Sequence, residues 1–445
     1  MKKKTELLFF VLSLIIILFI VAYLFGAYSF SNYLKPIPLL QEIKHFYNEG
    51  GFFFNKRHIQ PKRYLGNNII NSVKDDNSIV LLSGYFDDEN QIRLIKKDGT
   101  LIHKWSNNYF DHFPNKKLRV CKVVSPLLVD IHGIELNSKG EIVFNYEYCG
   151  TVKIDYCGKV IWTVSEKTHH SVTSSQKGGY WLLSQKSFTS KNLPAHLQRY
   201  DGVLSKFEII DDDYIKKINE HGETEFDLSI SELLIDNDFE YLLSFSVNSG
   251  DENRIELFHS NKITELKKNL TKSFPMFREG DLLISIRDHN LLFVVDPYKK
   301  IIKWHQIGPW INQHDPEFLI NGKISVFNNN TIYTNTFINK KINDINLKNL
   351  SNIMTVNPSD RSTEVVFGNK SNQQMQTTIR GDHDILQNGN IVITEFESGR
   401  VIEINNTGKI LWEYLNIYND KYVGEIINSK IFPESFLSDN INQCY

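Results

Sequence analysis

Four segments of the chain pair a histidine with a glycine turn and a strand-like run. They read DIHGIELNSKGEIVF, THHSVTSSQKGGYWLL, QHDPEFLINGKISVF and DHDILQNGNIVITEF, and they carry His132, His170, His314 and His383. Imidazole has an unperturbed pKa of about 6.5, so near neutral pH it can act as a nucleophile, a proton donor or a metal ligand. A single histidine of this kind would be an ordinary loop residue. Several at equivalent positions of a repeat indicate a common centre.

A second polar group lies between the second and third of these segments. His259 and Asn261 form an H-x-N pair, and Arg287 ends the strand-like run that follows. Arginine supplies a fixed charge and a planar fork of donors suited to an oxyanion. Histidines beside it can donate hydrogen bonds or exchange protons. These residue types together favour the transfer of an anionic group, in which charge spreads over equatorial oxygens.

The elements that position these residues are predicted by a second repeat, a turn and then a strand that ends in an aromatic residue. The repeat recurs every 45 to 63 residues, with one longer interval of 97, and its endings are Trp105, Trp162, Phe207, Trp304, Phe367 and Trp412. A four-strand unit of about 40–50 residues is typical of a β-propeller blade. The six endings therefore predict six blades, with the aromatic rings packed between them. Residues just before the innermost strands would converge at one mouth of the central channel.

The N-terminus predicts a membrane anchor. Three lysines, Lys2 to Lys4, precede an uncharged apolar run over residues 7–28, which is long enough to cross a bilayer. The lysines should stay cytoplasmic, which places the body in the periplasm or outside the cell. The alternative is a cleaved signal peptide with a weak cleavage site at Gly26-Ala27.

The predicted fold is therefore an all-β, six-bladed propeller preceded by one N-terminal transmembrane helix. Its parts are a cytoplasmic tip and anchor (1–28), a linker (29–75), the propeller (76–430) and a C-terminal tail (431–445). Charge is balanced, with 50 Lys+Arg against 52 Asp+Glu, which gives no reason to expect nucleic acid as a partner.

Two stretches are interpreted more simply. The insertion at about 209–250 contains Asp211, Asp212 and Asp213, which are expected in a solvated loop, and the segment ITELKKNLTKSF is expected to be helical. Cys149 and Cys157 flank one strand-like run, so they would be about 26 Å apart and could not pair without bending it. Cys121 and Cys444 would then be free or paired with each other, and the sequence leaves both open.

Several of these stretches carry a family resemblance: GTVKIDYCGKVIW with THHS, HSN followed by FPMFREGDLLISIRDHNLLFVVDP, QHDPEFLINGKISVFNN, and DHDILQNGNIVITE. Over residues 90–415 the chain resembles the bacterial aryl sulfotransferases that do not use PAPS and are built on a six-bladed propeller. The resemblance implies that His314 is the nucleophile that becomes sulfated. It also implies that His170, His259 and Arg287 surround the sulfuryl group, with Asn261 as their polar partner.

Other residues of the histidine repeat have weaker assignments. His383 is expected to contribute to substrate binding, and His132 stays ambiguous. His169 is expected to support His170 from behind, and Asp315 and Asp384 to orient their neighbouring histidines. The chain departs from the family in its insertion and in lacking an N-terminal β-domain, which leaves dimerisation and the range of acceptors open.

The activity implied by the resemblance is transfer of a sulfuryl group from a phenolic sulfate to a phenol or another hydroxyl through a sulfohistidine, with ping-pong kinetics. No metal and no cofactor are expected, and the chain lacks a G-x-x-x-x-G-K phosphate loop for a nucleotide donor. Two alternatives remain, a non-catalytic envelope propeller that binds a ligand or protein and a metal-dependent hydrolase that uses the histidines as ligands. The sequence does not identify the physiological donor, the acceptor or the oligomeric state.

Overall fold

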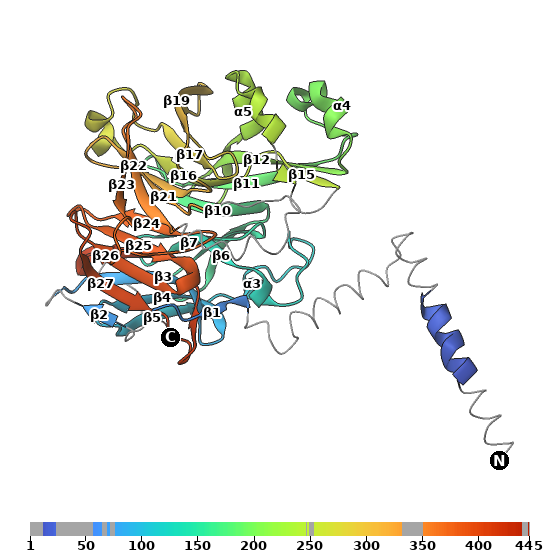
Figure 1. Ribbon diagram of the computed structural model, residues 1–445, viewed down its shortest axis with the longest axis horizontal. Helices are drawn as coiled ribbons and strands as arrows, with labels where there is room; N and C mark the ends of the chain where they lie inside the picture. Colours follow the sequence, from blue (N-terminus) through green and yellow to red (C-terminus); the bar gives the residue numbers. More distant parts are fainter. Residues whose placement is uncertain are drawn as a thin grey trace, which may run out of the picture. The chain divides into compact units, whose positions relative to one another are not determined.

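The computed structural model describes residues 12–23, 57–64, 69–71, 76–245, 247–248, 253–331, 350–437 and 444 (Figure 1). The chain forms two compact units, residues 1–58 and residues 59–445. In the first unit, residues 12–23 are helical and expose their apolar side chains. Within the described ranges, no helix is both long enough and apolar enough to cross a membrane. Of the predicted span at 7–28, residues 7–11 and 24–28 lie outside the described residues, as does most of the predicted linker.

The second unit is the predicted six-bladed β-propeller, with one sheet for each blade, antiparallel except for one parallel pair in the third blade. From the innermost strand outward, the first blade contains β29 (Ile426–Phe432), β3 (Ile79–Phe86), β4 (Glu89–Lys96) and β5 (Leu101–Ser106). The second contains β6 (Ile131–Leu136), β7 (Ile142–Tyr146), β8 (Gly150–Ile154) and β9 (Val160–Val164). The fourth contains β16 (Ser260–Glu265), β17 (Leu282–Ile286), β18 (Leu291–Asp296) and β19 (Ile301–Ile307).

The fifth and sixth blades follow the same order. They contain β20 (His314–Phe318), β21 (Ile324–Asn328), β22 (Asn352–Val356) and β23 (Thr363–Phe367), and then β24 (Asp382–Ile385), β25 (Ile391–Glu395), β26 (Arg400–Ile404) and β27 (Ile410–Leu415). Part of the segment predicted as a linker adds two short strands to this end of the chain. β2 (Ile69–Asn71) pairs with β27, and β1 (Ile59–Pro61) pairs with β28 (Tyr422–Gly424).

The third blade is larger than the others because it holds the insertion. It contains β10 (Lys167–Ser174), β11 (Tyr180–Phe188), β12 (Ile209–Ile218), β15 (Arg254–Glu256) and β14 (Val247–Asn248), and β13 (Thr224–Ser229) also pairs with β12. The helices of the second unit are short: α3 (Tyr109–His112), α4 (Asp201–Leu204) and α5 (Ile230–Asp236), with 3-10 turns η2 (Pro126–Leu128), η3 (Ala195–Tyr200), η4 (Glu240–Phe245), η5 (Lys268–Ser273), η7 (Phe396–Ser398) and η8 (Glu434–Phe436).

The innermost strands form a closed ring. β6, β10, β16, β20, β24 and β29 contact one another in that order, and β29 returns to β6. The first blade joins both ends of the propeller, because β29 from the C-terminal end pairs with β3 from the N-terminal end. The blue and red parts of the ribbon meet there (Figure 1). The ring brings residues from distant parts of the sequence to one channel.

Two of the predicted aromatic endings, Trp105 and Trp412, form hydrogen bonds between neighbouring blades, whereas the predicted ending at Phe207 follows the short helix α4 and ends no strand. The Trp105 indole N–H donates to the carbonyl of Tyr156 at 2.8 Å, and the Trp412 indole N–H donates to the carbonyl of Lys97 at 2.8 Å. Each bond runs from the outermost strand of one sheet to the segment after the third strand of the next sheet. Both rings are buried, so each contributes a large apolar area and leaves no donor unpaired.

Two expectations for the insertion and its surroundings are wrong. Asp211, Asp212 and Asp213 lie on β12 and are buried, because each carboxylate has polar partners, among them Arg254, Ser229 and Ser260 respectively. The segment ITELKKNLTKSF is not a helix. Its first residues complete β16, which pairs with β17, and its last ones form the 3-10 turn η5. Tertiary pairing overrides the local helical preference there.

The two disulfides join the four cysteines in a pairing that the sequence did not suggest. Cys149 and Cys157 do not bridge each other, as predicted, but Cys121 pairs with Cys149 and Cys157 pairs with Cys444. The Cα–Cα distances are 5.2 and 5.3 Å, which lie within the normal range. Neither Cys121 nor Cys444 is free. The sequence could not reveal this, because the segment carrying Cys121 folds back on the end of β7 and the tail carrying Cys444 returns to the second blade.

Candidate functional site

The inner strands are irregular where the histidines and their neighbours enter the channel. The pairing register shifts between His132 and Ile134, His169 and Val172, Ser260 and Lys262, His314 and Glu317, and Ile426 and Asn428. Bulges of this kind re-aim side chains and bend a strand. His170 and Asp315 have positive φ angles of 50° and 51°, which L-residues adopt only when surrounding contacts hold them. Five of the six blades therefore present a polar residue to the channel at an equivalent bulge.

The candidate residues come together. His132, His170, Asn261 and His314 line one cavity of about 40 Å³ at the propeller axis. The ring centroid of His170 lies 4.6 Å from that of His132 and 5.0 Å from that of His259. Four blades contribute these side chains, as the histidine repeat predicted.

His314 is held in one tautomer. Its Nδ1 lies 2.7 Å from Asn329 Oδ1 and 3.1 Å from the carbonyl oxygen of Asn312. The Asn329 amide nitrogen donates to the carbonyls of Thr377 and Arg380, so its oxygen must face His314. Both neighbours of Nδ1 are acceptors, so Nδ1 carries the proton and Nε2 keeps its lone pair.

The charge state of His314 agrees with this arrangement. Burial, together with the nearby Arg287 guanidinium, lowers the pKa of His314 to about 3. The imidazole is therefore neutral at physiological pH. A neutral, oriented imidazole with a free Nε2 is a competent nucleophile.

A carboxylate that the sequence did not single out holds two of the histidines. Glu147 Oε2 lies 2.7 Å from His132 Nδ1, and Glu147 Oε1 lies 3.1 Å from His170 Nδ1. Burial would raise the pKa of Glu147, but its contact with His132 and the Arg380 guanidinium lower it to about 2. Behind them, His169 stacks on Tyr148 and its Nε2 lies 3.4 Å from Asp213, which places it next to His170 as a supporting residue.

The pKa of His259 is shifted in the opposite direction to those of His170 and His314. Burial lowers its pKa, but Glu256, whose Oε2 lies 3.1 Å from His259 Nδ1, outweighs burial and raises that pKa above the usual value. The buried Nε2 of His259 has no hydrogen-bond partner among the described residues. The Arg287 backbone N–H donates to the His259 carbonyl at 2.8 Å, and the Arg287 side chain bonds to Asp288 at 2.7 Å. An imidazole with a raised pKa and a guanidinium thus lie near His314.

Asn261 and His383 make different contacts with the protein. Asn261 donates to the carbonyl of Gln313 at 2.8 Å, which ties the bulge of β16 to the residue before His314. His383 is buried, with Nε2 2.7 Å from Ser325 Oγ and Nδ1 3.1 Å from Asp315 Oδ2. Both ring nitrogens of His383 therefore face protein groups, and its contribution to substrate binding stays a prediction. Asp315 orients His383, rather than its own neighbour His314, and also pairs with Lys262.

Comparison with known proteins identifies the family of this chain. A model of the family described as Arylsulfotransferase (ASST) matches residues 125–417. The chain belongs to the arylsulfotransferase family. The matched range contains every site residue named above.

Structural similarity to solved proteins is distant. A protein of unknown function from Bacteroides caccae shares 14% identity with this arylsulfotransferase family member, at a TM-score of 0.47, over 80% of this chain and 99% of the other. A catalytically inactive virginiamycin B lyase from Staphylococcus aureus with quinupristin shares 10% identity, at a TM-score of 0.41, over 82% and 97%. No curated protein matches the sequence.

Three second-strand positions of this arylsulfotransferase family member are equivalent. Glu147 directly follows β7, Arg287 follows β17 and Asn329 follows β21, and each contacts or faces a site histidine. Arg287 was identified from the sequence, but Glu147 and Asn329 were not. Comparison of this position, directly after the second strand, between the blades would have indicated both Glu147 and Asn329.

Two groups of side chains in the site could hold a metal ion. The candidate ligand atoms of His132, Glu147 and His170 lie within 4.8 Å of one another, as do those of Glu256, His259 and Asp288. Nitrogen and carboxylate ligands of this kind suit Zn²⁺ or similar ions. In both groups the carboxylate already neutralises or orients a histidine. The expectation of a metal-free site stays a prediction.

Proposed function

We propose that the chain is an aryl sulfotransferase that moves a sulfuryl group from a phenolic sulfate to a phenol or another hydroxyl through a sulfohistidine at His314. Membership of the arylsulfotransferase family supports the reaction class. The observation that carries the mechanism is the fixed tautomer of His314, whose Nδ1–H is held by Asn329. This leaves Nε2 free for attack.

In the first half-reaction, His314 Nε2 attacks the sulfur of the aryl sulfate. The N–S bond forms, the S–O bond to the ring breaks, and its electron pair leaves with the phenolate. The His259 imidazolium protonates that phenolate, which its raised pKa permits. Arg287 balances the charge on the equatorial oxygens. Asn329 Oδ1 accepts the Nδ1–H of the sulfated ring, which has become cationic.

The second half-reaction reverses these steps with a new hydroxyl. His259, now neutral, removes the proton of the acceptor hydroxyl as its oxygen attacks sulfur. The N–S bond breaks and its electron pair returns to His314 Nε2. Splitting the transfer in this way produces ping-pong kinetics. His170 has a pKa well below its usual value because of burial, so in this scheme it is a neutral hydrogen-bonding group and not the acid.

The test uses the full-length protein in a mild detergent with 4-nitrophenyl sulfate, with and without a phenol acceptor. We expect phenol release that depends on the acceptor and a mass increase of one sulfuryl group, and we expect both to disappear in His314→Ala. His196→Ala is the matched variant, because His196 lies outside both cavities of the site and its Nε2 is 2.8 Å from Ser231 Oγ, and it should keep the activity and the adduct. Turnover in His314→Ala equal to wild type would exclude His314 as the nucleophile.

A metal-dependent hydrolase is the second candidate, because His132, Glu147 and His170 form a group of ligand type and spacing. The same assay separates the two functions. Full activity after treatment with a chelator, with an adduct on His314, supports the transferase. Loss of activity on chelation that Zn²⁺ restores, without an adduct, supports the hydrolase.

We also propose that residues 7–28 anchor the protein in the cell membrane, with the propeller in the periplasm or outside the cell. The two disulfides support this location, because disulfides persist in oxidising compartments. Protease added to cells with a permeabilised outer layer should digest the propeller. Protection of the propeller until the cells are lysed would contradict this location.

A further inference from the structure

A second cavity adjoins the histidine cluster. It has a volume of about 570 Å³, and His259 and Glu256 form part of its wall together with Tyr148, Lys167 and Arg254. The cavity at the propeller axis, at about 40 Å³, is too small for an aromatic ring, because a cavity of about 150 Å³ is known to hold benzene. The larger cavity has room for a substituted ring. Because it includes His259, a ring bound there lies next to the proton donor of the proposed reaction.

Two cations in this wall share one carboxylate. The Arg254 guanidinium binds Asp211, and Lys167 Nζ lies 3.7 Å from the other oxygen of Asp211. Glu256 does not neutralise the second cation, because it pairs with His259. Lys167 and Arg254 thus bring two positive charges to this wall, against one negative charge on Asp211. The side chains of Lys167 and Arg254 are 32% and 33% exposed, so both remain accessible.

The positive charge extends beyond this wall. A neighbouring cavity shares Cys121 with the first and is lined by Lys116, Arg119 and Lys122. The chain as a whole has a formal net charge of −2, so this local excess of cations is not a consequence of composition. Basic clefts concentrate anions near them.

The insertion in the third blade supplies this feature. Asp211 lies on β12, and Arg254 and Glu256 are the first and last residues of β15, which pairs with β12 in parallel. The other blades have no counterpart of β15 in the described residues. If Lys167 and Arg254 served only to hold the sheet together, Asp211 and one of these two cations would be enough. The second cation indicates a ligand.

We propose that the larger cavity binds the aryl group of the substrate and that Lys167 and Arg254 select rings that carry a second anionic group, such as a carboxylate. This inference rests on the proposed sulfotransferase function and names its substrate class. In a ping-pong reaction the donor ring and the acceptor ring occupy the same cavity in turn. The preference therefore applies to both.

The experiment compares three acceptors of one ring type in the full-length protein, with 4-nitrophenyl sulfate as donor. They are 4-hydroxyphenylacetate, its methyl ester and tyramine, which are anionic, neutral and cationic respectively. We expect kcat/KM for the acid to exceed that for the ester by about two- to fivefold, as one partly exposed ion pair would give, and tyramine to be the poorest acceptor. The ratio should shrink at high ionic strength.

Substitutions identify the residues responsible. Arg254→Gln should reduce the ratio of acid to ester to about one, whereas Arg254→Lys, which keeps the charge, should retain most of it. Arg199→Gln is the matched control, because Arg199 is an exposed arginine that pairs with Glu240 outside the cavity, and it should leave the ratio unchanged. Thermal unfolding of each variant shows that it is folded.

Two results would overturn the inference. One is a wild-type ratio of acid to ester near or below one, and the other is an unchanged ratio in Arg254→Gln. If no acceptor is sulfated, the proposed function has failed, and calorimetric titration of the same three phenols tests the cavity without turnover. Tighter binding of the acid than of tyramine, lost in Arg254→Gln, would keep the anion-selective cavity. Equal binding would exclude it.

Discussion

At the scale of single residues, the site separates two histidines by their surroundings. Burial and the Arg287 guanidinium lower the pKa of His314 to about 3, whereas Glu256 raises the pKa of His259. These shifts fit the proposed roles of His314 as a neutral nucleophile and of His259 as the proton donor. Pairs of titratable groups that are shifted in opposite directions are a mark of acid–base and nucleophilic roles.

Asn329 offers a direct test of this separation. Between pH 5 and 8, protonation of His314 should not slow the release of phenol by the wild-type protein in the first half-reaction. A group with a pKa of about 3 is already neutral in this range. Asn329→Asp would place a carboxylate 2.7 Å from Nδ1 and raise the pKa of His314. The protonated ring has no lone pair, so the rate should fall as the pH is lowered through the raised pKa and recover above it.

The measurement is the rapid phase of phenol release from 4-nitrophenyl sulfate at each pH. Asn329→Leu serves as the uncharged control. It should lower the rate by about 10- to 100-fold at every pH, the cost of losing a hydrogen bond to a group that becomes charged. Identical pH profiles for wild type and Asn329→Asp would show that Asn329 does not set the state of His314.

At the scale of strands, the sequence predicted the elements better than their contacts. The histidine repeat correctly indicated that residues on different inner strands meet, because position in a blade is periodic along the chain. Asn329 and Glu147 escaped notice because their importance depends on which ring nitrogen they face. Asp211 to Asp213 were misassigned for a similar reason. Three consecutive carboxylates resemble a solvated loop until their partners on β13, β15 and β16 are known.

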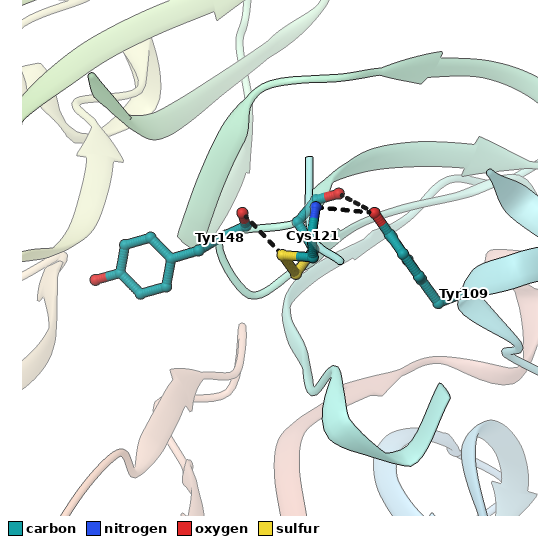
Figure 2. Close-up of a disulfide and its surroundings, with 4 residues drawn as sticks. Tyr109, Cys121 and Tyr148 are labelled. Carbon is teal, nitrogen blue, oxygen red and sulfur yellow. Dashed lines mark hydrogen bonds between the residues drawn. A yellow bond between two sulfur atoms is a disulfide. The ribbon is translucent and has the colours of Figure 1, made fainter. Parts of the chain in front are cut away.

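The Cys121–Cys149 disulfide links a loop to the strand end that carries Glu147 and Tyr148. Figure 2 shows Cys121 between Tyr109 and Tyr148, with the ring of Tyr148 directed away from the disulfide. The Cys121 backbone N–H donates to the Tyr109 hydroxyl at 3.4 Å, and that hydroxyl donates to the carbonyl of Cys149 at 3.3 Å. Cys121 and Tyr148 both line the larger cavity. This disulfide therefore belongs to the wall of the proposed substrate cavity.

The two disulfides should have different effects when removed. Cys121→Ser frees the wall of the cavity, so we expect KM for the acceptor to rise severalfold. Cys444→Ser opens a link between residues 287 apart, against 28 for the other. In the chain-entropy model the longer link contributes up to about 6 kcal/mol and the shorter about 4. Cys444→Ser should therefore lower the melting temperature more and KM less. Steady-state kinetics and thermal unfolding measure both, and equal effects on KM would remove the disulfide from the cavity wall.

At the scale of the whole propeller, the site exists only when the ring is closed. His132, His170, Asn261 and His314 come from four consecutive blades, so an opening between any two of these blades would separate them. Closure depends on β29, the strand that completes the first blade from the other end of the chain. The sequence analysis did not single out this strand, although it also ends in an aromatic residue, Phe432, because its place in the first blade follows only from its pairing with β3.

Truncation at the two sides of β29 tests this dependence. Ile426 and Ile427 are 0% and 3% exposed, and the burial of each isoleucine contributes about 1.5–3 kcal/mol. Removing the strand also leaves the inner edge of β3 unpaired. These losses together approach the 5–15 kcal/mol that stabilises a typical domain. A chain that ends at Glu425 should therefore not form the propeller.

A chain that ends at Leu437 keeps β29 and should fold with a lower melting temperature, because it lacks the Cys157–Cys444 disulfide. Near-ultraviolet circular dichroism and thermal unfolding distinguish the two, with Cys444→Ser as the control for the disulfide alone. A cooperative transition in the shorter chain would show that the remaining blades hold the ring without β29.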